Sequence, residues 1–178
     1  MPFVKEGDEL NPKILSLYKE INDELKIGKI PNILKTTSID PQIARWFWDG
    51  VKIILLRESS IPRILKESIA LVVSNANSCE YCTKAHGTLL QLMGFTEEKI
   101  IDLKGNFESF SDKEKSALNY ALKINDSANK ITSDDHKILK DSGYDDKQVV
   151  EITAVVAAFN WANVIADALG TEIENTDC

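Results

Sequence analysis

The segment 79–86, with the sequence CEYCTKAH, places two thiols and an imidazole close together in the chain. Each residue of an α-helix turns the side-chain direction by about 100°, so Cys79, Cys82 and His86 fall within an arc of about 60° on one face. The apolar residues Leu89 and Leu90 continue the same stripe. We therefore expect the two thiols and the imidazole to point into the core rather than toward water.

The spacing of these three residues suits thiol redox chemistry. Cβ atoms three residues apart on a helix are about 5–6 Å apart, and a slight tightening of the first turn can close this gap to a Cys79–Cys82 disulfide. The dipole and free N–H groups of a helix N-terminus favour a thiolate, which on its own would ionise Cys79 first. His86 lies four residues after Cys82, where helical side chains meet, so it can take the Cys82 proton. The spacing of His86 leads us to prefer Cys82 as the reactive thiol.

Glu67 is the candidate partner for the imidazole. It lies twelve residues before Cys79, on a helical stripe with Ile64 and Leu71. A carboxyl group on such a stripe is expected to be partly desolvated, with a raised pKa, and to pass protons near neutral pH. The simpler alternative is a surface ion pair with Arg63, four residues earlier.

The cysteine pair also has two simpler interpretations. Two cysteines can be small buried hydrophobic residues without chemistry. Alternatively, Cys79, Cys82, His86 and Glu67 offer four zinc ligands. The sequence holds no second C-x-x-C and no His pair, and structural zinc usually joins short loops rather than regular helices. We therefore favour redox chemistry, and we expect neither a metal nor a cofactor.

Helices have to position these residues, and the apolar spacing predicts an all-α fold of about seven or eight of them. Asp40 is a candidate cap before Pro41, Ser111-x-x-Glu114 is a capping box, and Gly170 is a helix stop. The run 152–158 is apolar nearly all round, so the last helix is expected to be the central, most buried one. Helices are predicted over 11–27, from 41, over 62–74, from 79 to 94, after 96, from 111, after 133 and over 146–169, with a connector at 29–37.

The 178 residues correspond to a single domain, 1–178, with residues 1–10 as a loose lead-in. The formal net charge of −7 makes nucleic acid or an anionic membrane an unexpected partner. The longest aliphatic runs, 53–56 and 69–73, are too short to cross a bilayer, and the N-terminus lacks the pattern of a signal peptide. Three cysteines, an odd number, do not indicate a disulfide scaffold, so we expect a cytoplasmic protein.

Three further residues allow only limited expectations. Cys178, the last residue, is expected to be an inert exposed thiol. Tyr81 is either a pocket wall or a hydroxyl donor, and the sequence does not separate these roles. Trp161 is more typical of a core or subunit contact than of a substrate site. The apolar last helix is compatible with self-association.

The pattern Glu67-x11-Cys79-x2-Cys82-x3-His86 resembles the signature of the alkylhydroperoxidase D (AhpD-like) branch of the carboxymuconolactone decarboxylase superfamily. The resemblance covers residues 54–105, about the core of the domain, and a second similarity lies in the closing helix, within 158–170. Two positions depart from the family pattern. Val164 stands where the family commonly has Arg, and Tyr81 stands where its prototype has His.

The resemblance implies an all-α AhpD-like domain with peroxidase, or peroxiredoxin, activity. Cys82 would be the cysteine that attacks a hydroperoxide, Cys79 the cysteine that resolves the sulfenic acid to a disulfide, and Glu67 with His86 the proton relay, acting through a water. It further implies a dithiol reductant, either a lipoyl protein or a thioredoxin-like protein, and a homo-oligomer, a trimer or hexamer.

Other functions stay open beside this one. The alternatives are a protein or lipoyl disulfide oxidoreductase and, less expected, a non-catalytic zinc-stabilised helical module. A decarboxylase is least expected, because the two thiols would then have no role in the reaction.

Overall fold

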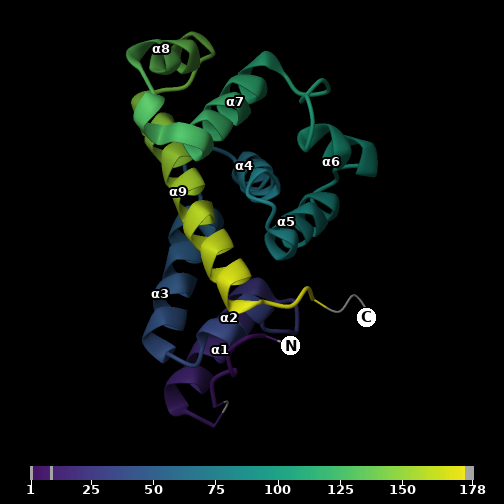
Figure 1. Ribbon diagram of the computed structural model, residues 1–178, viewed down its shortest axis with the longest axis vertical. Coiled ribbons are helices and arrows are strands. Elements are labelled where there is room, and N and C mark those ends of the chain that lie inside the picture. The colour runs from purple at the N-terminus through teal and green to yellow at the C-terminus, as the bar shows by residue number, and fades with distance from the viewer. Residues whose placement is uncertain (1, 9, 175–178) are drawn as a thin grey trace.

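The computed structural model describes residues 2–8 and 10–174, and within these residues it contains helices and no strand (Figure 1). The all-α prediction is therefore confirmed. The α-helices are α1 (Pro12–Leu25), α2 (Asn32–Thr37), α3 (Pro41–Val51), α4 (Arg63–Ala76), α5 (Glu80–Leu92), α6 (Glu97–Leu103), α7 (Asp112–Ser127), α8 (Ser133–Asp141) and α9 (Asp146–Leu169), with a π-helical turn η1 (Lys52–Leu56) and a 3₁₀ turn η2 (Ala128–Lys130).

Local capping decides where several helices begin and end. The Asp40 side chain accepts hydrogen bonds from backbone N–H groups at the start of α3, and Ser111 and Glu114 form the predicted capping box of α7. α9 begins at Asp146 and ends at Leu169, where Gly170 adopts a left-handed conformation with φ of 65°. These ends were predicted because caps depend on residues only a few positions apart.

The short helix α2 differs from the prediction, which placed a connector at 29–37. Pro31 precedes this helix of six residues, and Ile33 and Leu34 are buried. A helix this short offers too few residues for a helical period to be visible in the sequence.

The central helix is α4, and the expectation that α9 would be the most buried helix is wrong. Ten consecutive residues of α4, from 65 to 74, are buried, and the helix contacts α5, α7 and α9 (Figure 1). On α9, in contrast, Val150 and Val164 are 67% and 64% exposed. The apolar residues of α9 thus lie on two sides of the helix. Those on one side pack on α4, and those on the other side contribute to an outer face of the molecule.

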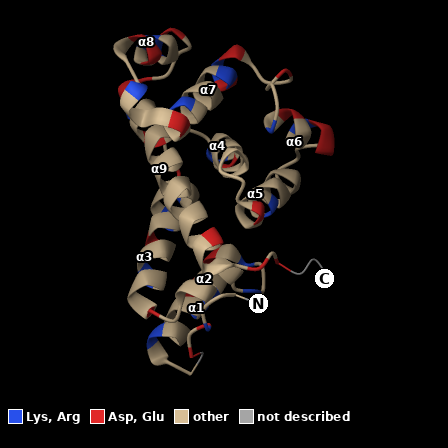
Figure 2. Cartoon of the chain, in the orientation of Figure 1, with Lys and Arg blue, Asp and Glu red and all other residues tan. Residues whose placement is uncertain are grey.

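Length and composition alone would let α9 cross a membrane, because its most apolar stretch has a mean hydropathy of 1.6. In the sequence, only the unbroken aliphatic runs 53–56 and 69–73 were considered, which lie outside α9, and so this helix was not identified as long and apolar enough. Charged residues are sparse along its middle (Figure 2). Core helices of folded domains have the same composition, and α9 packs against α4, α5 and α7 in this structure.

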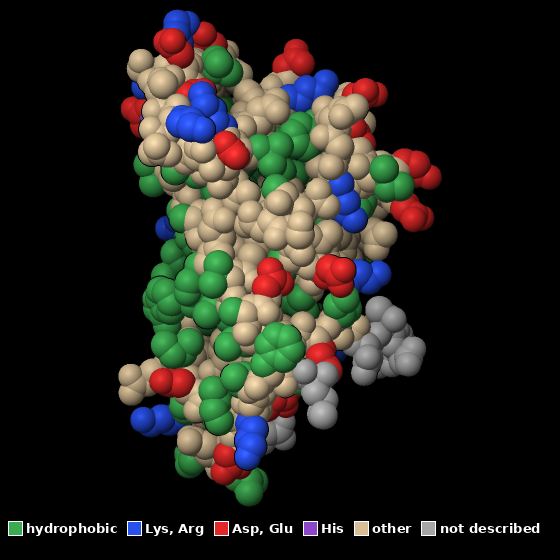
Figure 3. Space-filling view, viewed as in Figure 1, with side chains coloured by type: hydrophobic (Ala, Val, Ile, Leu, Met, Phe, Trp, Pro, Cys, Tyr) green, Lys and Arg blue, Asp and Glu red, His purple; other side chains and the backbone are tan. Residues whose placement is uncertain are grey.

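Hydrophobic side chains gather on the outer face formed by α3, η1 and α9 (Figure 3). The Trp161 ring of α9 packs against the rings of Trp46 and Phe47 of α3, with centroid distances of 4.3 and 4.7 Å. Trp46 nevertheless stays largely exposed, as do Ile53 and Val164. We call this surface, lined by Ile43, Trp46, Ile53 and Val164, the apolar outer face.

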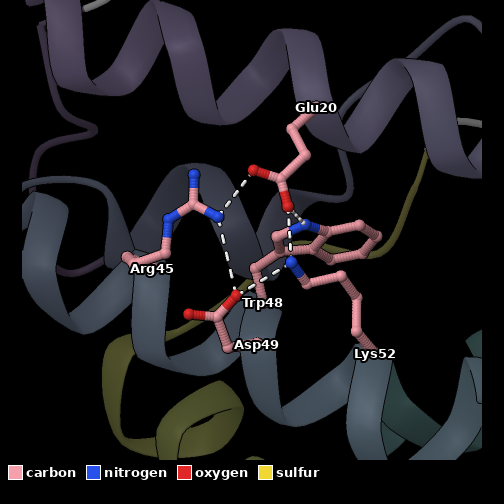
Figure 4. A network of polar contacts seen from close by, with 5 residues as sticks. All are labelled: Glu20, Arg45, Trp48, Asp49 and Lys52. Atoms are coloured by element: carbon pink, nitrogen blue, oxygen red, sulfur yellow. Dashed lines mark hydrogen bonds and ion pairs between the residues drawn. The ribbon is translucent and has the colours of Figure 1, made fainter.

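A polar network fixes α1 against α3 and η1 (Figure 4). The Glu20 carboxylate accepts hydrogen bonds from Arg45 Nη1 at 2.7 Å and from Trp48 Nε1 at 3.0 Å. Lys52 Nζ contacts both Glu20 and Asp49. One carboxylate of α1 therefore holds three donors from the neighbouring helical segment.

Hydrogen bonds join the described part of the N-terminal segment to the rest of the fold. The backbone N–H of Phe3 donates to the Leu169 carbonyl at 2.9 Å. The N–H of Gly7 donates to Ser38 Oγ at 3.1 Å. These contacts connect the start of the chain to the end of α9 and to the segment after α2.

Candidate functional site

The turn between α4 and α5 positions both cysteines. Ser78 adopts a left-handed conformation with φ of 60°, which reverses the chain so that α5 packs back against α4. Cys79 is the N-cap residue of α5, and its N–H donates to the Ser74 carbonyl at 3.0 Å. Cys82 follows in the first turn of α5. Both cysteines are free thiols and buried, with exposed fractions of 0% and 3%, so the prediction that they point inward is confirmed.

Glu67 on α4 is fully buried and contacts His86 on α5. Glu67 Oε2 lies 2.6 Å from His86 Nδ1, and Glu67 Oε1 accepts a hydrogen bond from Arg63 Nε, also at 2.6 Å. The predicted contact with His86 and the alternative ion pair with Arg63 are therefore both present. Because a carboxylate can only accept, Nδ1 carries a proton and Nε2 is the nitrogen available to exchange one.

The pKa of Glu67 is lowered, so the expectation of a raised pKa is wrong in direction. Burial of the carboxyl group would raise the pKa, but the charge and hydrogen bond of His86, together with those of Arg63, outweigh it. The sequence argument considered only the apolar stripe on α4 and not two partners at once. Glu67 is therefore a carboxylate that orients His86 rather than a proton donor near neutral pH.

The two cysteines have pKa values displaced in opposite directions. The pKa of Cys82 is lowered: its thiolate accepts hydrogen bonds from the Cys79 thiol and from Asn163, and a charged His86 favours it, which together outweigh its burial. The pKa of Cys79 is raised by its hydrogen bond to Cys82, by burial and by a hydrogen bond to Asp167. The site therefore favours a thiolate on Cys82, whereas helix-end electrostatics alone would ionise Cys79.

α9 completes the site with residues that the sequence reasoning did not identify as functional. The ring of Phe159 meets the His86 ring edge-on, with centroids 4.6 Å apart and planes at 90°. Asn163 lowers the pKa of Cys82, and Asp167 raises the pKa of Cys79. The sequence did offer one sign of these residues: Asn163 and Asp167 are polar and four positions apart, and therefore lie on one face of an otherwise apolar helix.

Tyr81 uses its hydroxyl group away from the redox pair. The hydroxyl donates to Glu174 Oε1 at 2.9 Å and accepts from the backbone N–H of Ile33 at 3.2 Å. Glu174 Oε1 also accepts from the N–H of Asn32 at 2.7 Å. Tyr81 is thus a hydroxyl donor that holds the segment after α9 against the start of α2. Cys178 lies outside the described residues.

The geometry gives the zinc interpretation no support. Across residues 2–8 and 10–174, no three or more His, Cys, Asp or Glu side chains are grouped so that they could hold a metal ion. Two surface pockets also lie away from the cysteines. One of them is next to His136 on α8, and the other is between α1 and α3. The four residues from the sequence pattern are all buried, and two of them, Glu67 and His86, are in direct contact.

Comparison with known proteins agrees with this arrangement. The model of the carboxymuconolactone decarboxylase family matches residues 41–123. The uncharacterized protein YdfG of Bacillus subtilis (strain 168) is 30% identical over 131 residues, which are 68% of this chain and 88% of that protein.

Similar solved structures cover nearly the whole chain. An uncharacterized peroxidase-related protein from Silicibacter sp. TM1040 has 25% identity and a TM-score of 0.86, covering 94% of this chain and 88% of that one. A peroxidase-related protein from Ralstonia eutropha JMP134, described as an alkylhydroperoxidase AhpD core, has 22% identity and a TM-score of 0.88, covering 98% and 93%. The debrominase Bmp8 has the same fold, with 21% identity and a TM-score of 0.79, covering 96% and 91%.

Proposed function

Because this chain belongs to the carboxymuconolactone decarboxylase family as an AhpD-like member, we propose that it is a thiol-dependent peroxidase that reduces hydrogen peroxide or small organic hydroperoxides. One observation carries the proposal. Cys82 has a lowered pKa, and it shares a buried cluster with a second thiol and with an imidazole oriented by the carboxylate of Glu67. A thiol nucleophile, a base one helical turn away and a group that orients this base are typical of nucleophilic catalysis.

In the first step, the Cys82 thiolate attacks one oxygen of the hydroperoxide. An S–O bond forms as the O–O bond breaks, so that Cys82 is oxidised to a sulfenic acid and the peroxide is reduced to an alcohol or water. The departing oxygen takes up a proton from the imidazole of His86. Glu67 holds Nδ1 of His86 throughout and so keeps Nε2 directed to this transfer, which passes through a water.

In the second step, Cys79 attacks the sulfur of the Cys82 sulfenic acid. The S–S bond forms, the S–O bond breaks, and the hydroxide leaves as water after taking up a proton. A dithiol then reduces the disulfide by exchange and is itself oxidised. The reductant is a lipoyl protein or a thioredoxin-like protein, and no metal or other cofactor takes part in these steps.

A protein or lipoyl disulfide oxidoreductase is the second candidate. The observation in its favour is the position of Cys79 at the start of a helix next to a second free thiol, since this arrangement suits disulfide exchange. The fold also occurs in the debrominase Bmp8, so thiol chemistry on substrates other than peroxides belongs among the alternatives to be assayed.

The deciding experiment measures peroxide consumption with dihydrolipoamide as the reductant. We expect Cys82→Ser to abolish turnover and Cys178→Ser to leave it unchanged. Mass spectrometry of peroxide-treated protein should show Cys79 linked to Cys82, and dihydrolipoamide should reverse this link. Undiminished turnover by Cys82→Ser would refute the assignment. A disulfide-exchange rate far above the peroxide rate would instead support the oxidoreductase.

The proposal includes an assembly and a location. We place the self-association surface on the apolar outer face, because its exposed side chains form a continuous patch (Figure 3). The expected assembly is a trimer or hexamer. We propose a cytoplasmic location, because three cysteines, an odd number, do not indicate a disulfide scaffold.

A further inference from the structure

We propose that Asn77 is a positioning residue of the redox pair: by fixing the turn between α4 and α5, it sets how readily Cys79 and Cys82 form a disulfide. Asn77 is the C-cap residue of α4, two positions before Cys79. Its side chain makes hydrogen bonds to α7 and α9, and so connects the turn to two helices that are distant in the chain. The inference deepens the proposed function and rests on it for its consequence in the catalytic cycle.

The Asn77 amide has partners at both of its ends. Its Nδ2 group donates to Asn160 Oδ1 at 3.0 Å and to Asn163 Oδ1 at 2.9 Å, both on α9. Its Oδ1 accepts from Asn125 Nδ2 on α7 at 2.8 Å. Because one amide both donates and accepts, each of these hydrogen bonds strengthens the others. Three hydrogen bonds to two helices therefore hold one side chain of the turn.

The same network reaches the backbone of Cys79. The N–H of Cys79 donates to the Ser74 carbonyl at 3.0 Å, and the Ser74 hydroxyl accepts from Asn163 Nδ2 at 2.9 Å. Ser74 and Asn163 are buried, with exposed fractions of 0% and 2%. A continuous series of hydrogen bonds thus runs from α7 through the Asn77 side chain to Asn163, Ser74 and the N–H of Cys79.

The turn decides the direction of the Cys79 side chain. Cys79 is the N-cap residue of α5, with φ of −78° and ψ of 99°, and Cys82 is the third residue of this helix. The side chain of an N-cap residue in this extended conformation is directed toward the second and third residues of its helix. In a helical conformation the Cβ atoms of Cys79 and Cys82 would instead lie about 5–6 Å apart, whereas a disulfide needs about 3.8 Å. The N-cap conformation of Cys79 therefore favours the disulfide.

Asn77 keeps the turn in the arrangement that gives Cys79 this conformation. Ser78, which lies between them, has φ of 60°, and an L-residue adopts this conformation only at a cost. Without the anchor at Asn77, the turn would relax and would hold the two sulfur atoms close for a smaller fraction of the time. A disulfide is favoured in proportion to the effective concentration of its two thiols, so the anchored turn stabilises the oxidised pair.

In the proposed cycle, the anchored turn acts at the second step. Cys79 attacks the sulfenic acid of Cys82, the S–S bond forms, the S–O bond breaks, and the hydroxide takes up a proton and leaves as water. A Cys79 that is already directed toward Cys82 reacts before a second peroxide adds another oxygen to that sulfur. Asn77 thus protects Cys82 from irreversible oxidation.

The test measures the equilibrium of the Cys79–Cys82 pair with dihydrolipoamide and lipoamide. In this exchange the S–S bond of the protein breaks as that of lipoamide forms, and the two thiol protons of dihydrolipoamide pass to the cysteines. In a Cys178→Ser background, alkylation with iodoacetamide and mass spectrometry give the fraction of disulfide at each ratio of the two reagents. We expect Asn77→Ala to shift the equilibrium constant roughly tenfold toward the dithiol, which corresponds to a reduction potential higher by about 30 mV.

Asn75→Ala is the matched control. Asn75 has the same side chain and lies in the last turn of α4, but it is exposed, and none of the hydrogen bonds described above involves its side chain. This variant should leave the equilibrium constant unchanged. If Asn77→Ala does not fold, Asn125→Ala replaces it, because it removes one of the three hydrogen bonds and should shift the constant in the same direction by a smaller factor.

The equilibrium constant separates positioning from a merely structural role. A structural role would destabilise the dithiol and disulfide forms equally, and would leave the constant unchanged. An unchanged constant in Asn77→Ala, a shift toward the disulfide, or an equal shift in Asn75→Ala would overturn the inference. The measurement needs no peroxide, so a shifted constant without peroxide consumption would refute the proposed function alone. Peroxide consumption with an unshifted constant would refute the inference alone.

Discussion

His86 and Glu67 lie nineteen positions apart in the chain, and the Nδ1 and Oε2 atoms of the two side chains lie 2.6 Å apart in the interior. The other oxygen of the carboxylate binds Arg63. A buried carboxylate with partners on both oxygens stays ionised and keeps the imidazole in one tautomer. This relationship connects the central helix α4 to the chemistry on α5.

Replacing this carboxylate should disable the imidazole without moving the thiols. Glu67→Gln removes the charge and lets the amide present either an acceptor or a donor to Nδ1. We expect peroxide turnover to fall about 100-fold, as for the loss of a general acid–base group. Arg63→Gln, which keeps the contact with His86, should cost much less. Equal losses in both variants would contradict the orienting role of Glu67.

The same residue predicts how stability depends on pH. Because the pKa of Glu67 is lowered in the folded state, its contribution is fully present above the unfolded value of 4.5. The contribution is lost as the pH falls through the folded pKa. The stability difference between the natural chain and Glu67→Gln, measured by urea denaturation, should therefore shrink under acidic conditions. A difference that grows toward low pH would contradict the assigned direction.

The network around Glu20 should contribute measurably to stability. Its pKa is lowered to about 2, first by the hydrogen bond from Lys52 and further by Arg45 and Trp48, against burial, whose effect is second in size to that of Lys52. Because the carboxylate is partly solvated, we expect Glu20→Gln to cost about 1 kcal/mol at neutral pH. The cost should be lost between pH 4.5 and about 2, where the carboxylate becomes protonated.

The control for Glu20 lies on the same helix. Asp23→Asn removes an exposed pair with Lys19 and should leave the free energy of unfolding nearly unchanged. Denaturant midpoints of both variants at several pH values provide the comparison. Equal effects of the two variants would show that the network adds nothing beyond a surface pair.

Ser78 should be a site where glycine stabilises the protein. The residue is exposed and has φ of 60°, a conformation that costs an L-residue about 1 kcal/mol and costs glycine little. Ser78→Gly is therefore expected to raise the free energy of unfolding by up to about 1 kcal/mol, measured by denaturant titration. Ser78→Ala, which keeps a Cβ atom, should give no such gain. A loss of stability in Ser78→Gly would point to a role of the hydroxyl group.

Tyr81→Phe should separate stability from chemistry. The buried N–H of Ile33 would lose its acceptor and Glu174 would lose a donor, at an expected cost of about 1–2 kcal/mol. We expect faster proteolysis of the segment after α9, while peroxide turnover persists. Loss of turnover as complete as in Cys82→Ser would instead place the hydroxyl group in the chemistry.

The sequence allowed the helices and the members of the site to be predicted where the signals are local. The caps at Asp40, Ser111 and Gly170 involve neighbours within a few residues, and the inward direction of Cys79 and Cys82 follows from helical periodicity alone. The contact between Glu67 and His86 was expected only because the two residues lie on helices that follow one another in the chain.

The remaining features depend on contacts between distant segments. Tyr81 and Glu174 are 93 positions apart, and no local pattern indicates that their side chains meet. The pKa of Glu67 depends on two partners, His86 and Arg63, and on their balance against burial, which an apolar stripe cannot show. The burial of α4 rather than α9 likewise follows from its position among three neighbours rather than from hydrophobicity, since α4 includes Lys66 and Glu67.

Because Cys79 and Cys82 are buried, we expect their depth to limit the size of the molecules that can react with them. Under the proposed function, we expect a molecule as small as hydrogen peroxide to need only a small side-chain movement to reach Cys82, whereas the broad surface of a folded protein would meet the α4–α5 turn first. A long, thin dithiol arm satisfies both conditions, since it can insert one sulfur while its carrier stays outside. In the proposed cycle, we expect the same shielding to slow the attack of a second peroxide on the sulfenic acid, so that Cys79 can resolve it before an irreversible form appears.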